Sequence, residues 1–179
     1  MSFVPEDRLG MGLVGEMSII DNVMLKSYQN LPGVMMDRTE GRKVADDIIE
    51  KLEVATPSPY HIVKKLSGGN IQKVVVAREF SGNPVLILAD QPTRGIDVGA
   101  TEFIRKKLVE LSRSGIAVLL ISADLAEVME LSDSLIVMHG GRIAAYFDDT
   151  STLTDDMMGE YMLGLKAQSA DEIRRVCHD

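Results

Sequence analysis

Apolar residues recur along the chain with two different periods, which together predict a mixed α/β fold. Unbroken apolar runs at 85–89 and 116–121 are typical of buried strands in a parallel sheet. A further pair of runs, 135–138 and 142–147, flanks His139-Gly140-Gly141 and predicts a hairpin. Apolar positions at helical spacing predict helices in these segments: 18–31, 37–52, 67–80, 98–113, 126–131 and 153–165.

Capping and breaking residues place several ends of these elements. Ser18 is a predicted N-cap, and Leu31-Pro32-Gly33 is expected to end the helix that it begins. Residues 3–8 are expected to form a strand end that runs into a loop, and the charged tail from Gln168 is expected to fray. Methionines such as Met17 and Met24 are interpreted mainly as core packing, with an exposed docking patch as the alternative.

The turn Leu66-Ser67-Gly68-Gly69-Asn70 opens a helix and is the first candidate for chemistry. Adjacent glycines let the backbone approach a ligand closely, and the Ser67 hydroxyl can cap the helix. Unpaired N–H groups at a helix start suit a phosphate. Downstream, the run 85–89 delivers the Asp90 carboxylate to the carboxyl end of a strand, where open α/β sheets bind ligands. By itself, Ser-Gly-Gly would be interpreted as a flexible turn.

Charge and cysteine content exclude several classes of protein. The net charge of -8 argues against nucleic acid as the main partner, because phosphate backbones require Lys and Arg surfaces. A single cysteine, Cys177, offers no disulfide partner within the chain and fits a reducing compartment. The three histidines, His61, His139 and His178, have no ligand spacing for zinc. No apolar run reaches the roughly 18–20 residues needed to span a bilayer, so we expect a cytosolic chain.

With LSGGN-I-QK at 66–73, VLILADQPTRGID at 85–97 and FVPEDR at 3–8, the chain resembles the nucleotide-binding subunit of an ATP-binding cassette (ABC) transporter. It is most similar to the second, C-terminal cassette of the tandem subunits that import simple sugars and nucleosides. The resemblance implies the C-terminal part of a RecA-like P-loop ATPase core with a helical subdomain. The implied segments are a Q-loop strand end at 1–8, the helical subdomain at 9–65, the signature helix, Walker B strand and core at 66–150, and a C-terminal helix and tail at 151–179.

The resemblance also implies roles for individual residues. Ser67, Gly68 and Gly69, with Asn70 and Gln72 extending the motif, would close in trans over a nucleotide held by a partner cassette. Asp90 corresponds to the Mg²⁺-holding aspartate of the Walker B strand. Asp97 corresponds to the D-loop that bridges the two sites, and Glu6 stands where the Q-loop has a glutamine. Without the family context, Glu6-Asp7-Arg8 would be interpreted as a solvated loop with a local ion pair.

Other family elements are altered or missing. Gln91 occupies the position of the catalytic glutamate, and an amide cannot act as a base. Ala123 occupies the position of the switch histidine, so the imidazole is lost as well. The sequence holds no GxxxxGK[ST] phosphate loop and no Gly-Lys dipeptide, and we expect it to begin downstream of that loop. We therefore expect weak or undetectable binding of ATP and Mg²⁺ by the chain alone, and apolar surface left uncovered.

Three hypotheses of function follow from these residues. In the first, the chain is a partial cassette of a sugar or nucleoside importer that supplies the signature turn in trans and docks on a membrane permease. In the second, it is a self-sufficient dimeric ATPase that uses Asp90 and Gln91. In the third, it is a regulatory or scaffold fragment that pairs with other cassettes. The transported substrate is specified elsewhere, in the permease and its binding protein.

Overall fold

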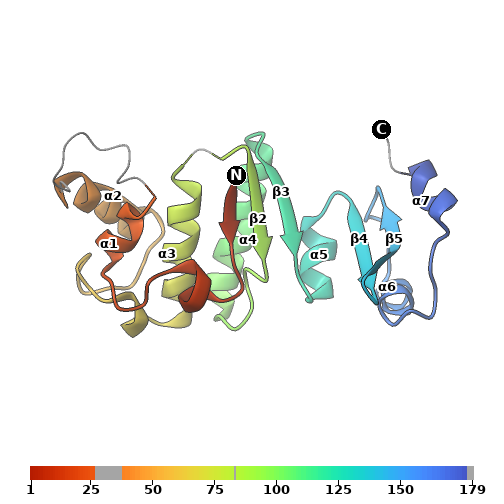
Figure 1. Ribbon diagram of the computed structural model, residues 1–179, viewed down its shortest axis with the longest axis horizontal. Helices are drawn as coiled ribbons and strands as arrows, with labels where there is room; N and C mark the ends of the chain where they lie inside the picture. Colours follow the sequence, from red (N-terminus) through yellow and green to blue (C-terminus); the bar gives the residue numbers. More distant parts are fainter. Residues whose placement is uncertain (27–37, 83, 177–179) are drawn as a thin grey trace. The chain divides into compact units, whose positions relative to one another are not determined.

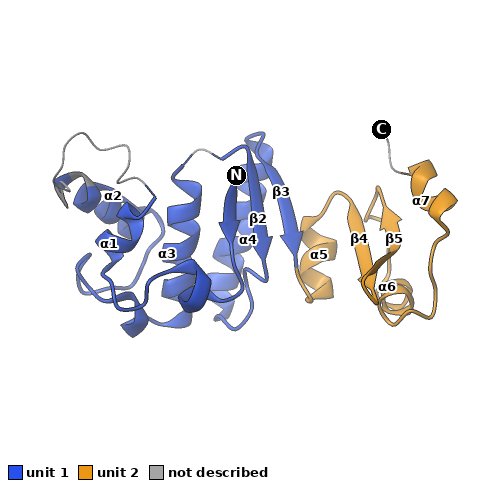
Figure 2. Ribbon diagram, viewed as in Figure 1, with its two compact units in different colours: residues 1–121 blue, residues 122–179 orange. Residues whose placement is uncertain are grey.

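The computed structural model describes residues 1–26, 38–82 and 84–176, and the chain divides into two compact units, 1–121 and 122–179 (Figure 2). Several predicted features lie outside the described residues: the helix end at Leu31-Pro32-Gly33, the helix start at 37, Cys177 and His178.

The first unit contains a parallel sheet and the helices that precede and connect its strands (Figure 1). Its elements are β1 (Ser2–Val4), a π-helical turn (Arg8–Gly12), α1 (Ile19–Met24), α2 (Arg38–Lys51), a 3₁₀ turn (Val63–Lys65), α3 (Gly68–Phe80), β2 (Leu86–Asp90), α4 (Val98–Arg113) and β3 (Ala117–Ile121).

The sheet has three strands in the order β1-β2-β3, and both neighbouring pairs are parallel. The register pairs Val4 with Ala89 and Ala89 with Leu120, so these residues share one face of the sheet. Because the strands are parallel, their carboxyl ends meet at one edge. The predicted parallel pairing of 85–89 and 116–121 is confirmed, and each observed strand starts one residue later than expected.

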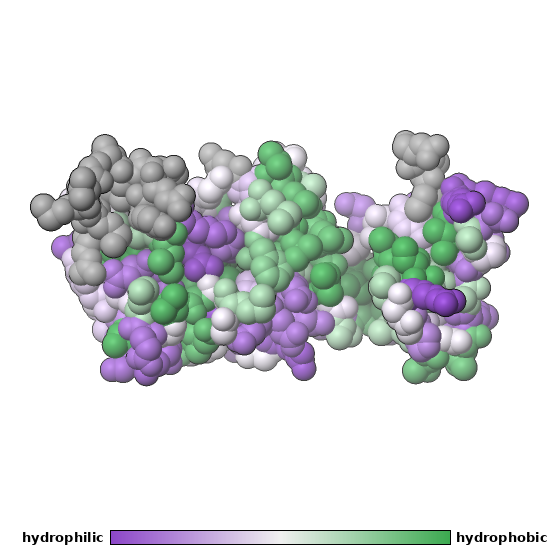
Figure 3. Space-filling model, in the orientation of Figure 1, coloured by the Kyte–Doolittle hydropathy of each residue, from purple (hydrophilic) through white to green (hydrophobic). Residues whose placement is uncertain are grey.

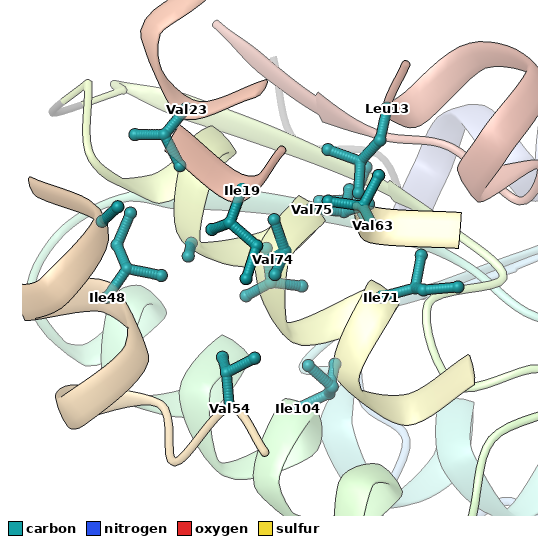
Figure 4. Packing of buried hydrophobic residues seen from close by; sticks show 14 of the residues in the cluster. Leu13, Ile19, Val23, Ile48, Val54, Val63, Ile71, Val74, Val75 and Ile104 are labelled. Atoms are coloured by element: carbon teal, nitrogen blue, oxygen red, sulfur yellow. The ribbon is translucent and has the colours of Figure 1, made fainter. Parts of the chain in front are cut away.

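Helix α3 is the centre of the hydrophobic core of the first unit. Val74, Val75 and Val76 are fully buried although they point in three directions around the helix, so α3 is packed on all sides. Figure 4 shows side chains from the surrounding elements that gather on it, among them Ile19 of α1 and Ile104 of α4. A helix in this position is held by tertiary packing, and each fully buried valine contributes roughly 1.5–3 kcal/mol.

A buried carboxylate fixes the C-terminal end of α3 to the first strand. Glu79 is 2% exposed; its Oε2 accepts a hydrogen bond from the Phe3 N–H (3.1 Å) and pairs with Lys26, which follows α1. The other oxygen, Oε1, accepts from Arg78 Nη2 (3.0 Å). The Ser2 hydroxyl donates to the Glu79 carbonyl oxygen (2.6 Å). One side chain therefore joins β1, α3 and the end of α1.

Within the described residues, the opposite face of the sheet is partly exposed. Val4, Ile87 and Ala89 are buried against α3 and α4, whereas Leu119 and Ile121 on the other face are 48% and 46% exposed. Figure 3 shows apolar residues gathered over the strands on the side in view. A parallel sheet is ordinarily covered on both faces, so the expectation of uncovered apolar surface is confirmed for these residues.

The second unit is a small hairpin with helices around it. It contains α5 (Leu125–Leu131), β4 (Leu135–His139), β5 (Arg142–Phe147), α6 (Asp155–Met162) and α7 (Ala170–Val176). The predicted hairpin is confirmed, since β4 and β5 pair antiparallel, with a register shift between Val137 and Met138. Its core consists of Val137, Ala145 and Met158 with their neighbours. In the described part of the chain, no helix combines the length and apolarity needed to cross a bilayer.

The prediction of a frayed tail was wrong for residues 168–176, which are capped and helical, whereas 177–179 lie outside the described residues. Ser169 caps α7 through a reciprocal pair: the Glu172 N–H donates to Ser169 Oγ (3.2 Å), and the Ser169 N–H donates to Glu172 Oε2 (2.7 Å). Gln168 is held to β5 because its N–H donates to the Ala144 carbonyl (2.8 Å) and its Oε1 accepts from the Tyr146 N–H (2.9 Å). The sequence signal was the spacing of Ser169 and Glu172.

Two predicted helices are shorter in the structure. Ser18 is the N-cap of α1 as predicted, with its side chain accepting from the Asp21 N–H, but the helix ends at Met24. Two residues after the helix, Lys26 forms an ion pair with Glu79 of α3. Helix α6 ends at Met162 because Gly164 adopts a positive φ of 73°. Of the methionines interpreted as core, Met24 is buried, whereas Met17 is 40% exposed.

Replacing Glu79 by glutamine tests the anchor of α3. The amide keeps the shape of the side chain but leaves Arg78 and Lys26 without their anion, so we expect a loss of about 1–3 kcal/mol in the free energy of unfolding. Urea unfolding followed by circular dichroism measures this loss. Glu102→Gln, an exposed change on α4, is the matched control and should stay within about 0.5 kcal/mol of the parent. Equal stabilities for the two variants would contradict the role of Glu79 in anchoring α3.

Candidate functional site

The signature turn is held by its own side chains. Ser67 caps α3, with Oγ accepting from the Asn70 N–H (3.4 Å) and from Asn70 Nδ2 (2.8 Å). Asn70 Oδ1 in turn accepts from the Ala55 N–H (2.8 Å), which ties the turn to the segment after α2. Ser67 itself is exposed. The turn therefore presents a hydroxyl and a helix N-terminus to its surroundings from a fixed position.

Gly69 is required by close neighbours, whereas Gly68 has only ordinary contacts. A Cβ on Gly69 would lie 2.6 Å from Asp97 Oδ2 and 2.9 Å from the Ala100 Cβ, which is too close for a side chain. A Cβ on Gly68 would lie 3.5 Å from the Gly95 carbonyl oxygen. Asp97 is the N-cap of α4 and accepts from the Ala100 N–H (2.9 Å). The structure thus brings the signature turn and the predicted D-loop residue into direct contact within one chain.

The segment after β1 contacts both α3 and the loop between β2 and α4. Arg8 Nε donates to Gln72 Oε1 (2.9 Å), and Arg8 Nη2 donates to the Arg94 carbonyl oxygen. Glu6 forms an ion pair with Arg94, whereas Asp7 accepts from the N–H groups of Leu9 and Gly10. The alternative of a solvated loop with a local ion pair holds only in part: Glu6 and Asp7 are exposed, but Glu6 pairs with Arg94 and Arg8 bonds to Gln72.

Gln72 is fully buried between these segments. Its Nε2 is, within the described residues, a buried donor that lacks a hydrogen-bond partner. Burial lowers the pKa of the Arg8 guanidinium from its ordinary value, but a guanidinium remains protonated throughout the physiological range. The contact between Arg8 and Gln72 is therefore a charge-assisted hydrogen bond to a buried acceptor.

The strand end that carries Asp90 leads directly into a strained turn. Gln91 has a φ of 48°, which is uncommon for a residue with a side chain. Its N–H donates to the Ile121 carbonyl (2.8 Å), and its own carbonyl accepts from the Arg94 N–H (3.2 Å). Asp90, the last residue of β2, is half-buried at the carboxyl edge of the sheet.

Ser67 and Asn70 bond to each other in the signature turn, and Asp90 and Gln91 follow one another at the end of β2. Gly68, Gly69, Gln72, Asp97 and Glu6 are connected through direct approaches or through the two arginines. Ala123 follows β3 in the second unit, is exposed, and offers only a methyl group.

Sequence analysis missed the part played by Arg8 and Arg94. Both were visible as charged residues inside the motif segments at 3–8 and 85–97. Nothing in their spacing indicated that segments more than 60 residues apart would share them.

The residues fit nucleotide and Mg²⁺ only in part. Asp90 is an oxygen donor of the kind that Mg²⁺ prefers, but no group of three or more His, Cys, Asp or Glu side chains in the described ranges could hold a metal by itself. Mg²⁺ is commonly held by one or two carboxylates together with phosphates and water. At Asp90, Mg²⁺ would therefore also need the phosphates of a nucleotide, and another part of the assembly would have to bind that nucleotide.

The chain has the mixed α/β fold of ABC ATPase cassettes, a P-loop NTPase fold. The ATP-binding cassette MJ0796, solved as a dimer in a post-hydrolysis state bound to ADP and Pi, superposes with a TM-score of 0.68 at 28% identity. That match covers 81% of this chain and 61% of the MJ0796 chain. The expected fold class is confirmed.

In sequence, the chain is similar to import ATP-binding proteins. The guanosine import ATP-binding protein NupO of Bacillus subtilis is 43% identical over 171 residues, which is 93% of this chain and 33% of NupO. The ribose import ATP-binding protein RbsA of Shouchella clausii is 34% identical over 165 residues, or 92% of this chain and 33% of RbsA. The chain thus spans about a third of the length of these relatives. No family model matches the chain.

Replacing Gly69 by alanine tests the contact between the signature turn and Asp97. The added methyl group must displace the Asp97 carboxylate or Ala100, so we expect a loss of about 1–3 kcal/mol in the free energy of unfolding. Urea unfolding measures it. Gly82→Ala is the control, because a Cβ there meets nothing within 4 Å and should cost less than about 0.5 kcal/mol. An unchanged stability for Gly69→Ala would show that the turn can shift to accept the added methyl group, which would contradict the close contact with Asp97.

Proposed function

We propose that this chain is part of the ATP-binding subunit of a nucleoside or sugar ABC importer. In this proposal it corresponds to the second cassette without its phosphate loop. Its residues Ser67, Gly68 and Gly69 complete, in trans, an ATP site whose phosphate loop belongs to a partner cassette. The chain docks on the membrane permease from the cytoplasmic side. The relatives named above and the dimeric MJ0796 cassette support the importer class and the partner cassette.

One observation carries the proposal: the signature turn is complete while the chain's own hydrolytic positions are not. Ser67 caps α3 from an exposed position, and the close approach of Asp97 fixes the backbone of Gly69. By contrast, the positions proposed for the catalytic base and the switch residue hold Gln91 and Ala123, neither of which takes up a proton at neutral pH. This geometry favours a chain that offers N–H groups and a hydroxyl to the ATP site of another cassette over a chain that hydrolyses ATP by itself.

In the assembled site, the chain's residues would act on the γ-phosphate of a nucleotide bound by the partner. N–H groups at the start of α3, together with the Ser67 hydroxyl, would stabilise phosphate charge, as preorganised donors do. Asp90 would hold Mg²⁺ only in the chain's own site, if a phosphate loop is supplied to it. Asp97 would lie between the two sites, because it already touches Gly69.

A mixing experiment tests the function. The chain is added to an intact cassette of a nucleoside importer whose own signature serine and glycines have been replaced, and ATP hydrolysis is measured. We expect hydrolysis to rise with chain concentration and to fall roughly tenfold or more for Ser67→Ala combined with Gly69→Ala. Ser112→Ala, an exposed serine on α4, is the control and should stimulate like the parent.

The chain alone provides the second arm of this test. Calorimetric titration with Mg-ATP should give no saturable binding up to millimolar concentration, because no phosphate loop is present. Saturable binding with hydrolysis by the isolated chain would overturn the proposal in favour of a self-sufficient ATPase. Absence of stimulation, with the parent chain folded and mixed with a competent partner, would overturn the role in trans.

A further inference from the structure

Arg8 sits where three segments of the first unit meet. It is the first residue of the π-helical turn Arg8–Gly12, which Asp7 caps by accepting from the N–H groups of Leu9 (3.3 Å) and Gly10 (2.8 Å). From there the guanidinium reaches Gln72 of α3 through Nε (2.9 Å) and the Arg94 carbonyl after β2 through Nη2. The segment after β1, the signature helix and the loop after the Walker B strand therefore share one cation.

The guanidinium also lies against the backbone of two glycines. A Cβ on Gly68 would lie 3.6 Å from Arg8 Nη1, and a Cβ on Gly95 would lie 4.0 Å from Arg8 Nη2. Gly95 has a φ of 66°, a conformation that favours glycine. The first residue of α3 and the loop after β2 are thus both within contact range of the same planar group.

The chemistry of this contact requires arginine. A guanidinium offers several N–H donors in a fixed plane, so it can hold an acceptor on α3 and another on the loop at once. A lysine has one flexible ammonium and cannot span both acceptors with the same geometry. Gln72 is buried, and its Nε2 already lacks a partner among the described residues, so loss of Arg8 would also leave its carbonyl oxygen without this donor.

We infer that Arg8 is a positioning residue that sets the start of the signature helix relative to the loop after β2. The inference rests on the proposed function, since it specifies how the turn is held ready for a nucleotide on a partner cassette. The N-terminal half of α3 is then coupled to the segment after β1, just as Glu79 fixes its C-terminal half to β1 itself. The exposed pair between Glu6 and Arg94 adds little to this link, because solvent screens it.

The test compares Arg8→Lys and Arg8→Ala with Arg113→Ala, an exposed arginine at the end of α4. Amide hydrogen exchange is measured at Asn70 and Ile71, which bond back to Ser67, and at Val76 in the middle of the same helix. We expect exchange roughly tenfold faster at Asn70 and Ile71 in both Arg8 variants, with Val76 and the control unchanged. Uniform acceleration along α3, or no change at Asn70 and Ile71, would overturn the inference.

A comparison of local exchange with global stability separates positioning from general stability. In Arg8→Lys, the ammonium can keep one acceptor but not both, so we expect exchange at Asn70 and Ile71 to stay faster than in the parent while urea unfolding stays close to that of the parent. In the mixing assay, Arg8→Lys should require more chain for half-maximal stimulation than the parent or Arg113→Ala. If the parent chain gives no stimulation, the proposed function fails while the exchange data still decide the role of Arg8. Stimulation by Arg8→Lys equal to that of the parent would overturn the positioning role of Arg8.

Discussion

The burial of α3 on all sides is the constraint on which the rest of the first unit depends. A helix with Val74, Val75 and Val76 all buried must be surrounded, and α1, α2, α4 and the sheet supply its neighbours. Because polar groups inside such a core need partners, Gln72 and Glu79 dictate where the N-terminal segment runs. The position of the signature turn is therefore a result of core packing around the helix that follows it.

The sequence predicted the elements of this unit well because their signals are local. Ser18 and Ser67 each cap the helix that follows, and the apolar runs before Asp90 and up to Ile121 form parallel strands. What could not be predicted is how distant polar side chains pair. Arg8 lies 64 residues from Gln72, and no periodicity connects them. The tail was missed for another reason, since its capping pair was visible but outweighed by the charge around it.

The signature turn and the exposed sheet residues lie in the same unit. They differ in how far contacts within this chain hold and cover them. The turn is fixed by contacts made within the described chain, with Asp97, Ala55 and Arg8 as its neighbours. Leu119 and Ile121, in contrast, present apolar area to solvent, which a helix-covered parallel sheet does not do. The element proposed to act in trans is thus held by contacts within this chain, whereas β3, next to the strand that carries Asp90, leaves Leu119 and Ile121 exposed among the described residues.

At Gln91, the position proposed for the catalytic base, the backbone is held by its neighbours. A left-handed backbone at a residue with a side chain persists only where the surroundings fix it, and here the Ile121 carbonyl and the Arg94 N–H do so. Glutamine and glutamate have the same length and nearly the same shape, but an amide oxygen accepts a hydrogen bond and does not take up a proton at neutral pH. In the proposed function, the base of the ATP site therefore comes from the partner cassette that also holds the phosphate loop.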